Sequence, residues 1–125
     1  MNAMQLLVES SGDVRILRVK EPKLTYPTLS GFLAEVRRLV EEGTRKLVID
    51  LQAVTYVDSA SIGCLMDVRR LLTEQGGLLK LSGLQPRVET MISMTGVHKI
   101  VDIHRDEDDA VLSFAPRKGR GKGDA

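Results

Sequence analysis

Aromatic residues and cysteine are scarce in this 125-residue sequence, which has no tryptophan, two phenylalanines, two tyrosines and one cysteine. Platforms that stack nucleic-acid bases and cages that hold quaternary ammonium groups are built from aromatic residues, so neither is expected. The lone Cys64 excludes a disulfide within the chain and a structural zinc site made of several cysteines. A single free thiol is also typical of a protein from the reducing cytoplasm.

Membrane-spanning, secretory and nucleotide-binding signals are missing as well. No apolar run reaches the roughly 18 residues of a membrane-spanning helix, and the amino terminus lacks the basic and apolar regions of a signal peptide. Neither a Gly-x-Gly-x-x-Gly turn nor a phosphate-binding loop ending in Gly-Lys-Ser/Thr occurs. We therefore expect a cytoplasmic protein with no membrane insertion and no cofactor.

The charges nearly cancel overall but are unevenly placed. The 18 basic and 17 acidic residues leave a net charge of +1, which does not favour nucleic acid as a direct partner. Residues 116–125 carry +3 and leave −2 for residues 1–115. Because this tail alternates glycine with basic residues and has no large apolar residue to anchor it, we expect it to be flexible. The sequence thus predicts one folded domain, 1–115, and a flexible basic glycine-rich tail, 116–125.

Hydrophobic periodicity predicts an alternation of strands and helices. The runs 4–10 and 14–20 should form a hairpin around a Ser-Gly-Asp turn, whereas 21–27 is predicted to be irregular. Further strands are expected at 46–51, 78–82 and 99–104, and helices at 28–42, 58–75, 86–95 and 106–114. Strands joined through helices need right-handed crossovers, which give a parallel sheet with the first strand as its antiparallel exception. The predicted fold class is α/β, a single domain with a mixed, mostly parallel sheet of about five strands and about four helices.

Residues able to carry catalysis or to bind a metal are few. His98 and His104 would share a face of the last strand, with Asp102 and Asp106 nearby, and a metal pair there is one alternative. Solvent-facing histidines at the ends of a strand are the simpler interpretation. Cys64 lies in the apolar stripe of a helix without a neighbouring histidine or basic residue, which favours an inert buried thiol. We predict no catalytic residue and no metal site.

The segment 55–63, between the central strand and the second helix, holds the candidate site. Asp58 and Ser59 are both good helix N-caps, and capping is the simplest role for the pair. The loop also follows the carboxyl end of a parallel strand, where ligands and partners dock in such sheets. A hydroxyl at a helix amino terminus can moreover be switched, since a phosphate adds about −1.5 to −2 charges. Capping and a phosphorylation switch are two interpretations of the same residues.

Several short motifs occur in a characteristic order along the chain. The apolar strand 46–51 and Val54 are followed by Val57-Asp58-Ser59-Ala60-Ser61-Ile62-Gly63, then by Gly76-Gly77 before an apolar strand, and by Pro86-Arg87-Val88 leading to Met94-Thr95-Gly96-Val97. Together they resemble the STAS domain of anti-sigma factor antagonists, in which an apolar strand precedes Asp-Ser-Ser-Gly-Leu-Gly. The resemblance spans about residues 4–113 and implies the STAS fold.

The resemblance implies a partner-switching regulator and not an enzyme. In that family the unmodified antagonist binds a serine kinase that doubles as an anti-sigma factor, and the sigma factor is released. The kinase phosphorylates the serine directly after the aspartate, which is Ser59 here, and a metal-dependent serine phosphatase reverses the modification. The implied partner-binding residues are Asp58, Ser59, Ala60, Ser61, Ile62, Thr25 and Tyr26.

The sequence departs from the family pattern in two places. Ala60 and Ser61 replace the usual serine and glycine, so that Ser61 offers a second hydroxyl. Thr25 stands where the family often has an aspartate, and an inserted Pro27 follows Tyr26, which alters this part of the expected partner surface. Relatives also serve in lipid-transport complexes, sensor assemblies and sulphate transporters. The alternative function is therefore a constitutive subunit of a membrane-associated transport or sensor complex without a phospho-switch.

Overall fold

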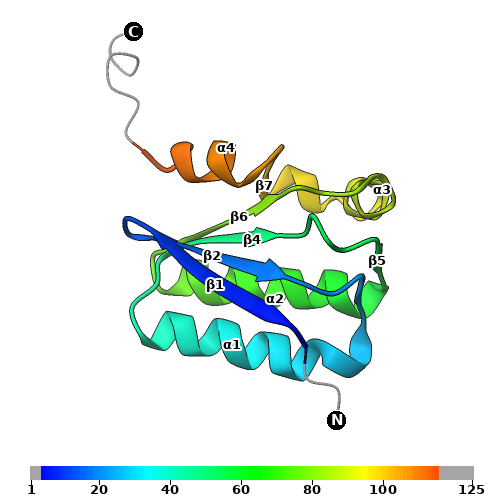
Figure 1. The fold of residues 1–125 in the computed structure, drawn as a ribbon, viewed down its shortest axis with the longest axis horizontal. Helices are drawn as coiled ribbons and strands as arrows, with labels where there is room; N and C mark the ends of the chain where they lie inside the picture. Colours follow the sequence, from blue (N-terminus) through cyan, green and yellow to red (C-terminus); the bar gives the residue numbers. More distant parts are fainter. Residues whose placement is uncertain (1–3, 116–125) are drawn as a thin grey trace, which may run out of the picture.

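The computed structural model describes residues 4–115, which form a five-stranded sheet, a second sheet of two short strands, and four α-helices. The strands of the large sheet lie in the order β1-β2-β4-β6-β7 (Figure 1). Their bounds are β1 Leu6–Ser11, β2 Val14–Val19, β4 Lys46–Asp50, β6 Leu78–Ser82 and β7 Asp102–His104. The predicted tail 116–125 and residues 1–3 lie outside the described residues.

Strand directions follow from the connections. β1 and β2 form an antiparallel hairpin that turns at Gly12, whose φ of +62° favours glycine. The pairs β2–β4, β4–β6 and β6–β7 are all parallel because a helix or a helical turn connects their strands. The predicted fold class, a mixed and mostly parallel sheet of five strands with four helices, is confirmed, and so is β1 as the antiparallel strand.

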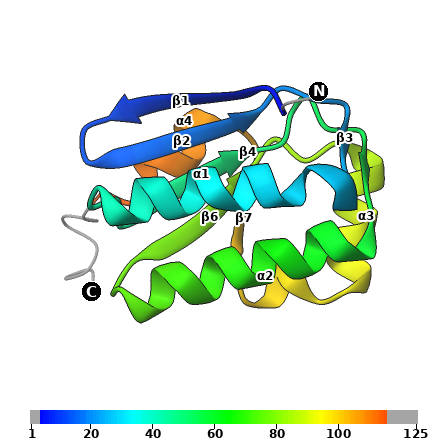
Figure 2. The same ribbon diagram turned by 90° about the horizontal axis from the view of Figure 1, so that it is seen from below.

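Helices cover both faces of the sheet. α1 (Leu29–Glu41) and α2 (Ser59–Glu74) run side by side over one face (Figure 2), and the short α4 (Glu107–Leu112) lies over the other (Figure 1). α3 (Pro86–Met94) stands near the end of the sheet at which β2 and β4 finish.

The central strand β4 contributes to a core on each side of the sheet. Leu47 and Ile49 are fully buried in the large core beneath α1 and α2, whereas Val48 belongs to the small core beneath α4. An unbroken apolar run is typical of such a doubly covered strand, and it predicts the burial that β4 has. α4 is held in addition by an ion pair between Arg18 and Glu107 and by a hydrogen bond from Lys80 Nζ to Ser113 Oγ.

Two local predictions are wrong. The segment expected to be irregular contains β3 (Lys23–Leu24), which pairs in parallel with β5 (Tyr56–Val57), and the 3-10 turn η1 (Tyr26–Thr28). Strands of two residues are too short to produce a periodic pattern. The last strand is also shorter than expected, because another 3-10 turn, η2 (Val97–Lys99), occupies its predicted start.

Candidate functional site

The start of α2 is closed by a reciprocal pair of hydrogen bonds between Asp58 and Ser61. Asp58 Oδ1 accepts from the backbone N–H of Ser61 at 2.9 Å, and Ser61 Oγ accepts from the backbone N–H of Asp58 at 3.0 Å. This arrangement is a capping box, which satisfies donors at a helix start that would otherwise have no partner. Asp58 is therefore the N-cap of α2.

Ser61 and Ile62, which the sequence predicts to be partner-binding residues, lie inside the molecule. The Ser61 side chain is 0% exposed, and its hydroxyl also donates to the carbonyl oxygen of Asp58 at 2.8 Å. Ile62 belongs to the large core. The third and fourth residues of α2 face the sheet here, so neither side chain is available to a docked protein.

Ser59 is the exposed first residue of α2. Its hydroxyl makes no hydrogen bond with any residue that the structure describes, and the cap does not need it because Asp58 and Ser61 complete the capping box. Ala60 is half-buried beside it. Two roles that the sequence could not separate are thus divided in the structure: Asp58 caps the helix, and the Ser59 hydroxyl is spare.

A segment 32 residues earlier in the chain is tied to this cap. The backbone N–H of Tyr26 donates to Asp58 Oδ2 at 2.9 Å, so one carboxylate joins the starts of η1 and α2. The β3–β5 pair lies directly before both of them. Thr25 is half-buried and Tyr26 is 73% exposed, and the bond to Asp58 brings Tyr26 next to the residue that precedes Ser59. The sequence singles out both residues, but no local pattern could reveal a hydrogen bond across 32 positions.

The Asp58 carboxylate carries a persistent negative charge. Burial alone would raise its pKa, but the hydrogen bonds from Tyr26 N and from Ser61 together lower the pKa of Asp58 below its usual range. The charge also sits at the positive end of the α2 dipole, which favours it further. Ser59 therefore follows directly after an ionised acid at any pH near neutrality.

Asp50, at the carboxyl end of β4, is in the opposite situation. Its side chain is buried and accepts a hydrogen bond from Ser82 Oγ at 2.7 Å. Burial raises the pKa of Asp50 in spite of that bond. A cavity of about 350 Å³ lined by Gln52 and three acidic residues of the α4 start adjoins it.

The other candidate sites do not assemble. His98 lies in η2 and His104 in β7, so the prediction that they share a strand face is wrong. Among residues 4–115, no three histidine, cysteine, aspartate or glutamate side chains are arranged to hold a metal ion. Cys64 is buried in the large core, and burial raises the pKa of its thiol, which keeps it protonated and unreactive near neutral pH.

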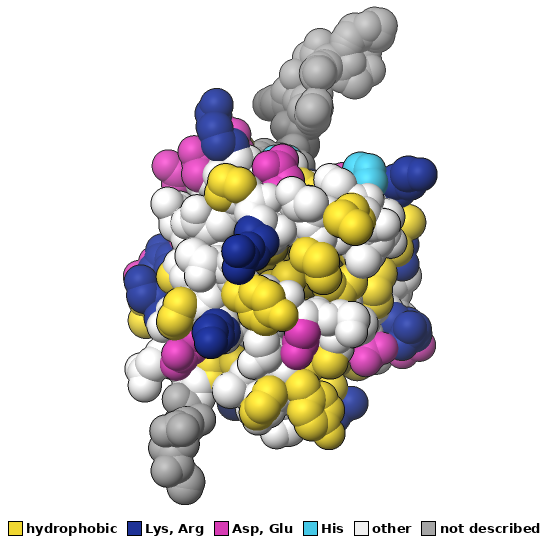
Figure 3. All heavy atoms as spheres, turned by 90° about the vertical axis from the view of Figure 1, so that its right-hand side faces the viewer, with side chains coloured by type: hydrophobic (Ala, Val, Ile, Leu, Met, Phe, Trp, Pro, Cys, Tyr) yellow, Lys and Arg dark blue, Asp and Glu magenta, His cyan; other side chains and the backbone are white. Residues whose placement is uncertain are grey.

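The surface around the start of α2 is rich in apolar side chains. Figure 3 shows them gathered over the centre and lower part of this end of the molecule, with charged side chains scattered around them. Tyr26 in η1, Tyr56 in β5 and Met94 at the end of α3 are among the large apolar residues that are exposed, and all three elements lie at this end. Exposed apolar patches with a polar surround are typical of protein interaction sites.

These features define a small α/β domain. One end of it presents an apolar surface, the capped start of α2 and the exposed hydroxyl of Ser59. The sequence profile of the STAS domain matches residues 5–110. The chain belongs to the STAS domain family. No helix within residues 4–115 is both long and apolar enough to cross a bilayer.

Proteins of this family resemble the chain both in sequence and in structure. The chain is 34% identical over 73 residues to the anti-sigma-B factor antagonist of Bacillus subtilis, a match that covers 58% of this chain and 66% of the relative. The fold is similar to that of an anti-sigma factor antagonist from Mycobacterium paratuberculosis, with a TM-score of 0.80, 23% identity and coverage of 89% and 93% of the two chains. It is also similar to the Bacillus cell fate determinant SpoIIAA in its phosphorylated form, with a TM-score of 0.69, 14% identity and coverage of 89% and 100%.

Proposed function

We propose that this protein is an anti-sigma factor antagonist that acts as a partner switch. With Ser59 unmodified it binds a serine kinase that is also an anti-sigma factor, and phosphorylation of Ser59 by that kinase ends the complex. A metal-dependent serine phosphatase restores the binding form. The names of the relatives support the regulatory class, and they name regulators and not enzymes.

One observation carries the assignment of Ser59. It is the exposed residue at the first position of α2, and its hydroxyl is engaged by no described group while its neighbours Asp58 and Ser61 complete the cap. A kinase needs a hydroxyl that is exposed, free of hydrogen bonds within the protein and able to reach the γ-phosphate of ATP. Ser59 fulfils that requirement without any loss of helix capping, whereas Ser61 does not.

Phosphorylation at this position should alter the surface and leave the fold intact. A phosphate on the first residue of a helix is favoured by the helix dipole and by the unpaired N–H groups of the first turn. It adds about −1.5 to −2 charges beside the ionised Asp58. A partner that packs an apolar or acidic surface onto Tyr26, Ser59 and Ala60 would then face desolvation of the phosphate and repulsion between like charges, so the complex would dissociate.

The test reconstitutes the switch from purified parts. The protein is incubated with ATP and the serine-kinase anti-sigma factor of its source organism, the phosphorylated residue is located by mass spectrometry, and binding is measured by calorimetry for the wild type, Ser59→Ala and Ser59→Glu. We expect one phosphate at Ser59, near-normal binding by Ser59→Ala and at least tenfold weaker binding by Ser59→Glu. Phosphate only at another residue, or undiminished binding by Ser59→Glu, would overturn the proposal.

Ser10→Glu is the matched control, because Ser10 is an exposed serine in the β1–β2 hairpin, at the other end of the parallel strands. It adds the same charge and should bind the kinase like the wild type. A complex that forms with a membrane transport or sensor assembly and is indifferent to Ser59→Glu would instead support the constitutive subunit.

A further inference from the structure

A groove made of neighbouring cavities lies along the seam between α1 and α2. Three cavities of about 380, 390 and 440 Å³ follow one another there. The first and second share Leu33 and Asp67 as lining residues, and the second and third share Arg37 and Leu71. The groove begins at Tyr26 and Ala60, beside Ser59, and continues to the far ends of both helices.

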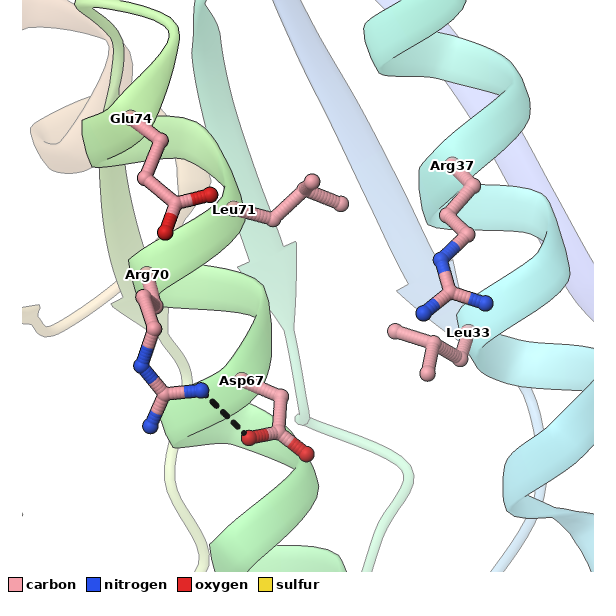
Figure 4. A pocket seen from close by; sticks show the side chains of 6 residues that line it. All are labelled: Leu33, Arg37, Asp67, Arg70, Leu71 and Glu74. Carbon is pink, nitrogen blue, oxygen red and sulfur yellow. Dashed lines mark hydrogen bonds and ion pairs between the residues drawn. The ribbon is translucent and has the colours of Figure 1, made fainter.

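The groove has an apolar floor and charged walls. In Figure 4, Leu33 from α1 and Leu71 from α2 point toward each other across the gap, and both are half-buried. Arg37 stands on the α1 side. On the α2 side Arg70 donates to Asp67 at 2.9 Å, so this pair is neutralised within its own helix.

Arg37 is a cation in the middle of this groove that is free to pair with a partner. It makes no hydrogen bond or ion pair with another residue of the described range 4–115. Its neighbour Arg38 is bound by Glu35 and Glu42 on the same helix, and Arg69 donates to the carbonyl oxygen of Ile100. An exposed guanidinium above an apolar floor is complementary to a carboxylate carried next to apolar side chains.

Gly63 at the mouth of the groove leaves open space beside the backbone of α2. It lies inside α2, is exposed, and a Cβ atom built on it would meet no atom within 4 Å. Glycine destabilises a helix interior relative to alanine, and no packing within the domain requires it here. A missing side chain at this point allows the backbone of a bound protein to approach α2 closely.

We propose that this groove binds an amphipathic helix of the anti-sigma factor, with its apolar stripe on Leu33 and Leu71 and a carboxylate on Arg37. The proposal rests on the proposed function and deepens it. A helix is the fitting occupant because the groove lies between two helices and offers no strand edge, so an extended peptide would leave its own backbone groups unpaired. The groove adds contact area at a distance from Ser59. The modification state of Ser59, at the mouth of the groove, decides whether the partner helix can dock there.

The test compares two adjacent arginines of α1 in the same binding assay. Purified serine-kinase anti-sigma factor is titrated into the wild type, Arg37→Glu, Arg38→Gln and Ser59→Glu. We expect Arg37→Glu to raise the Kd about tenfold or more, while Arg38→Gln binds like the wild type and thermal unfolding shows that both variants are folded. If Arg37→Glu binds the kinase with the same Kd as the wild type, the proposal that the groove binds a helix is wrong. The proposed function still stands in that case, provided that Ser59→Glu loses binding. Failure of the wild type to bind the kinase overturns both.

A second measurement does not depend on any variant. Backbone amide shifts of the labelled protein are recorded with and without the unlabelled kinase. Shifts that extend to Arg37, Leu71 and Gln75 support the groove, since these residues line its middle and far end. Shifts confined to the Tyr26 and Ser59 end contradict it.

Discussion

Asp58 and Ser61 satisfy each other's backbone N–H groups with their side chains, and this leaves the hydroxyl of the intervening Ser59 without a structural task. Ser61, which replaces the glycine of the family pattern, is thus part of the helix cap. Its substitution should affect folding, whereas substitution of Ser59 should affect regulation.

Ser61→Ala should lower the free energy of unfolding by about 1–2 kcal/mol, because it removes the acceptor of the Asp58 N–H within a buried cap. Ser59→Ala should change it by less than about 0.5 kcal/mol, as for an exposed residue without partners. Urea denaturation of both variants measures the difference. Equal effects of the two substitutions would contradict the division of roles between these serines.

Asp58→Asn should be less stable than the wild type near neutral pH, by about 0.5–1 kcal/mol, since the amide can accept on one side only and loses its attraction to the helix dipole. Because folding lowers the pKa of Asp58, its contribution is complete above the pKa of the unfolded chain, about 4, and disappears as the pH falls through the lower folded value. Unfolding measured from pH 7 down to pH 2 should show the two proteins converging in acid. A constant difference would argue against the lowered pKa.

Asp50→Asn should behave in the opposite way. Burial raises the pKa of Asp50, so its ionisation costs stability as the pH rises from about 4, the unfolded value, through the folded value. Asparagine removes that cost and can still accept the hydrogen bond of Ser82. The variant should gain stability relative to the wild type between pH 4 and pH 7, in the same measurement. If Asp50→Asn were less stable than the wild type at pH 7, the ionised carboxylate would have to stabilise the fold, which would contradict this prediction.

Gly63→Ala should stabilise the isolated domain by up to about 1 kcal/mol, because alanine is the better helix former and the added methyl group meets no atom. The same methyl group should weaken binding of the anti-sigma factor. Thermal unfolding and calorimetry on one preparation measure both effects. Improved stability together with unchanged affinity would mean that no partner approaches α2 at this residue.

The Cys64 thiol should react slowly with a thiol reagent in the native protein and rapidly in concentrated urea. It is 7% exposed, and burial raises its pKa. Absorbance at the wavelength of the released thiolate follows the reaction. Fast native labelling would require that the mouth of the α1–α2 groove opens frequently, because Cys64 lines it.

Most of the fold could be predicted because its elements are long enough to show a period. The stripe of α1 and the unbroken apolar run of β4 each specify which faces are covered. The two-residue strands β3 and β5 could not be predicted, since they exist only through each other's hydrogen bonds.

The loop between β5 and α2 could be predicted from the sequence, but the different surroundings of its two serines could not. In the sequence Ser61 appears as a second available hydroxyl beside Ser59, because its burial depends on which way the first turn of α2 faces the sheet. The α1–α2 groove was missed for a related reason: Leu33 and Leu71 look like ordinary members of their apolar stripes, and only the packing leaves them half-buried.

The bond between Tyr26 N and Asp58 Oδ2, together with the β3–β5 pair, has a kinetic consequence. It fastens together the two stretches of chain that carry the proposed partner surface, η1 and the start of α2, before any partner binds. The anti-sigma factor proposed above would have no loop to order on this surface, so little conformational entropy would be lost on association. Complex formation should therefore follow simple one-step kinetics with a rate set by diffusion and orientation, and the lifetime of the complex should carry most of the response to modification.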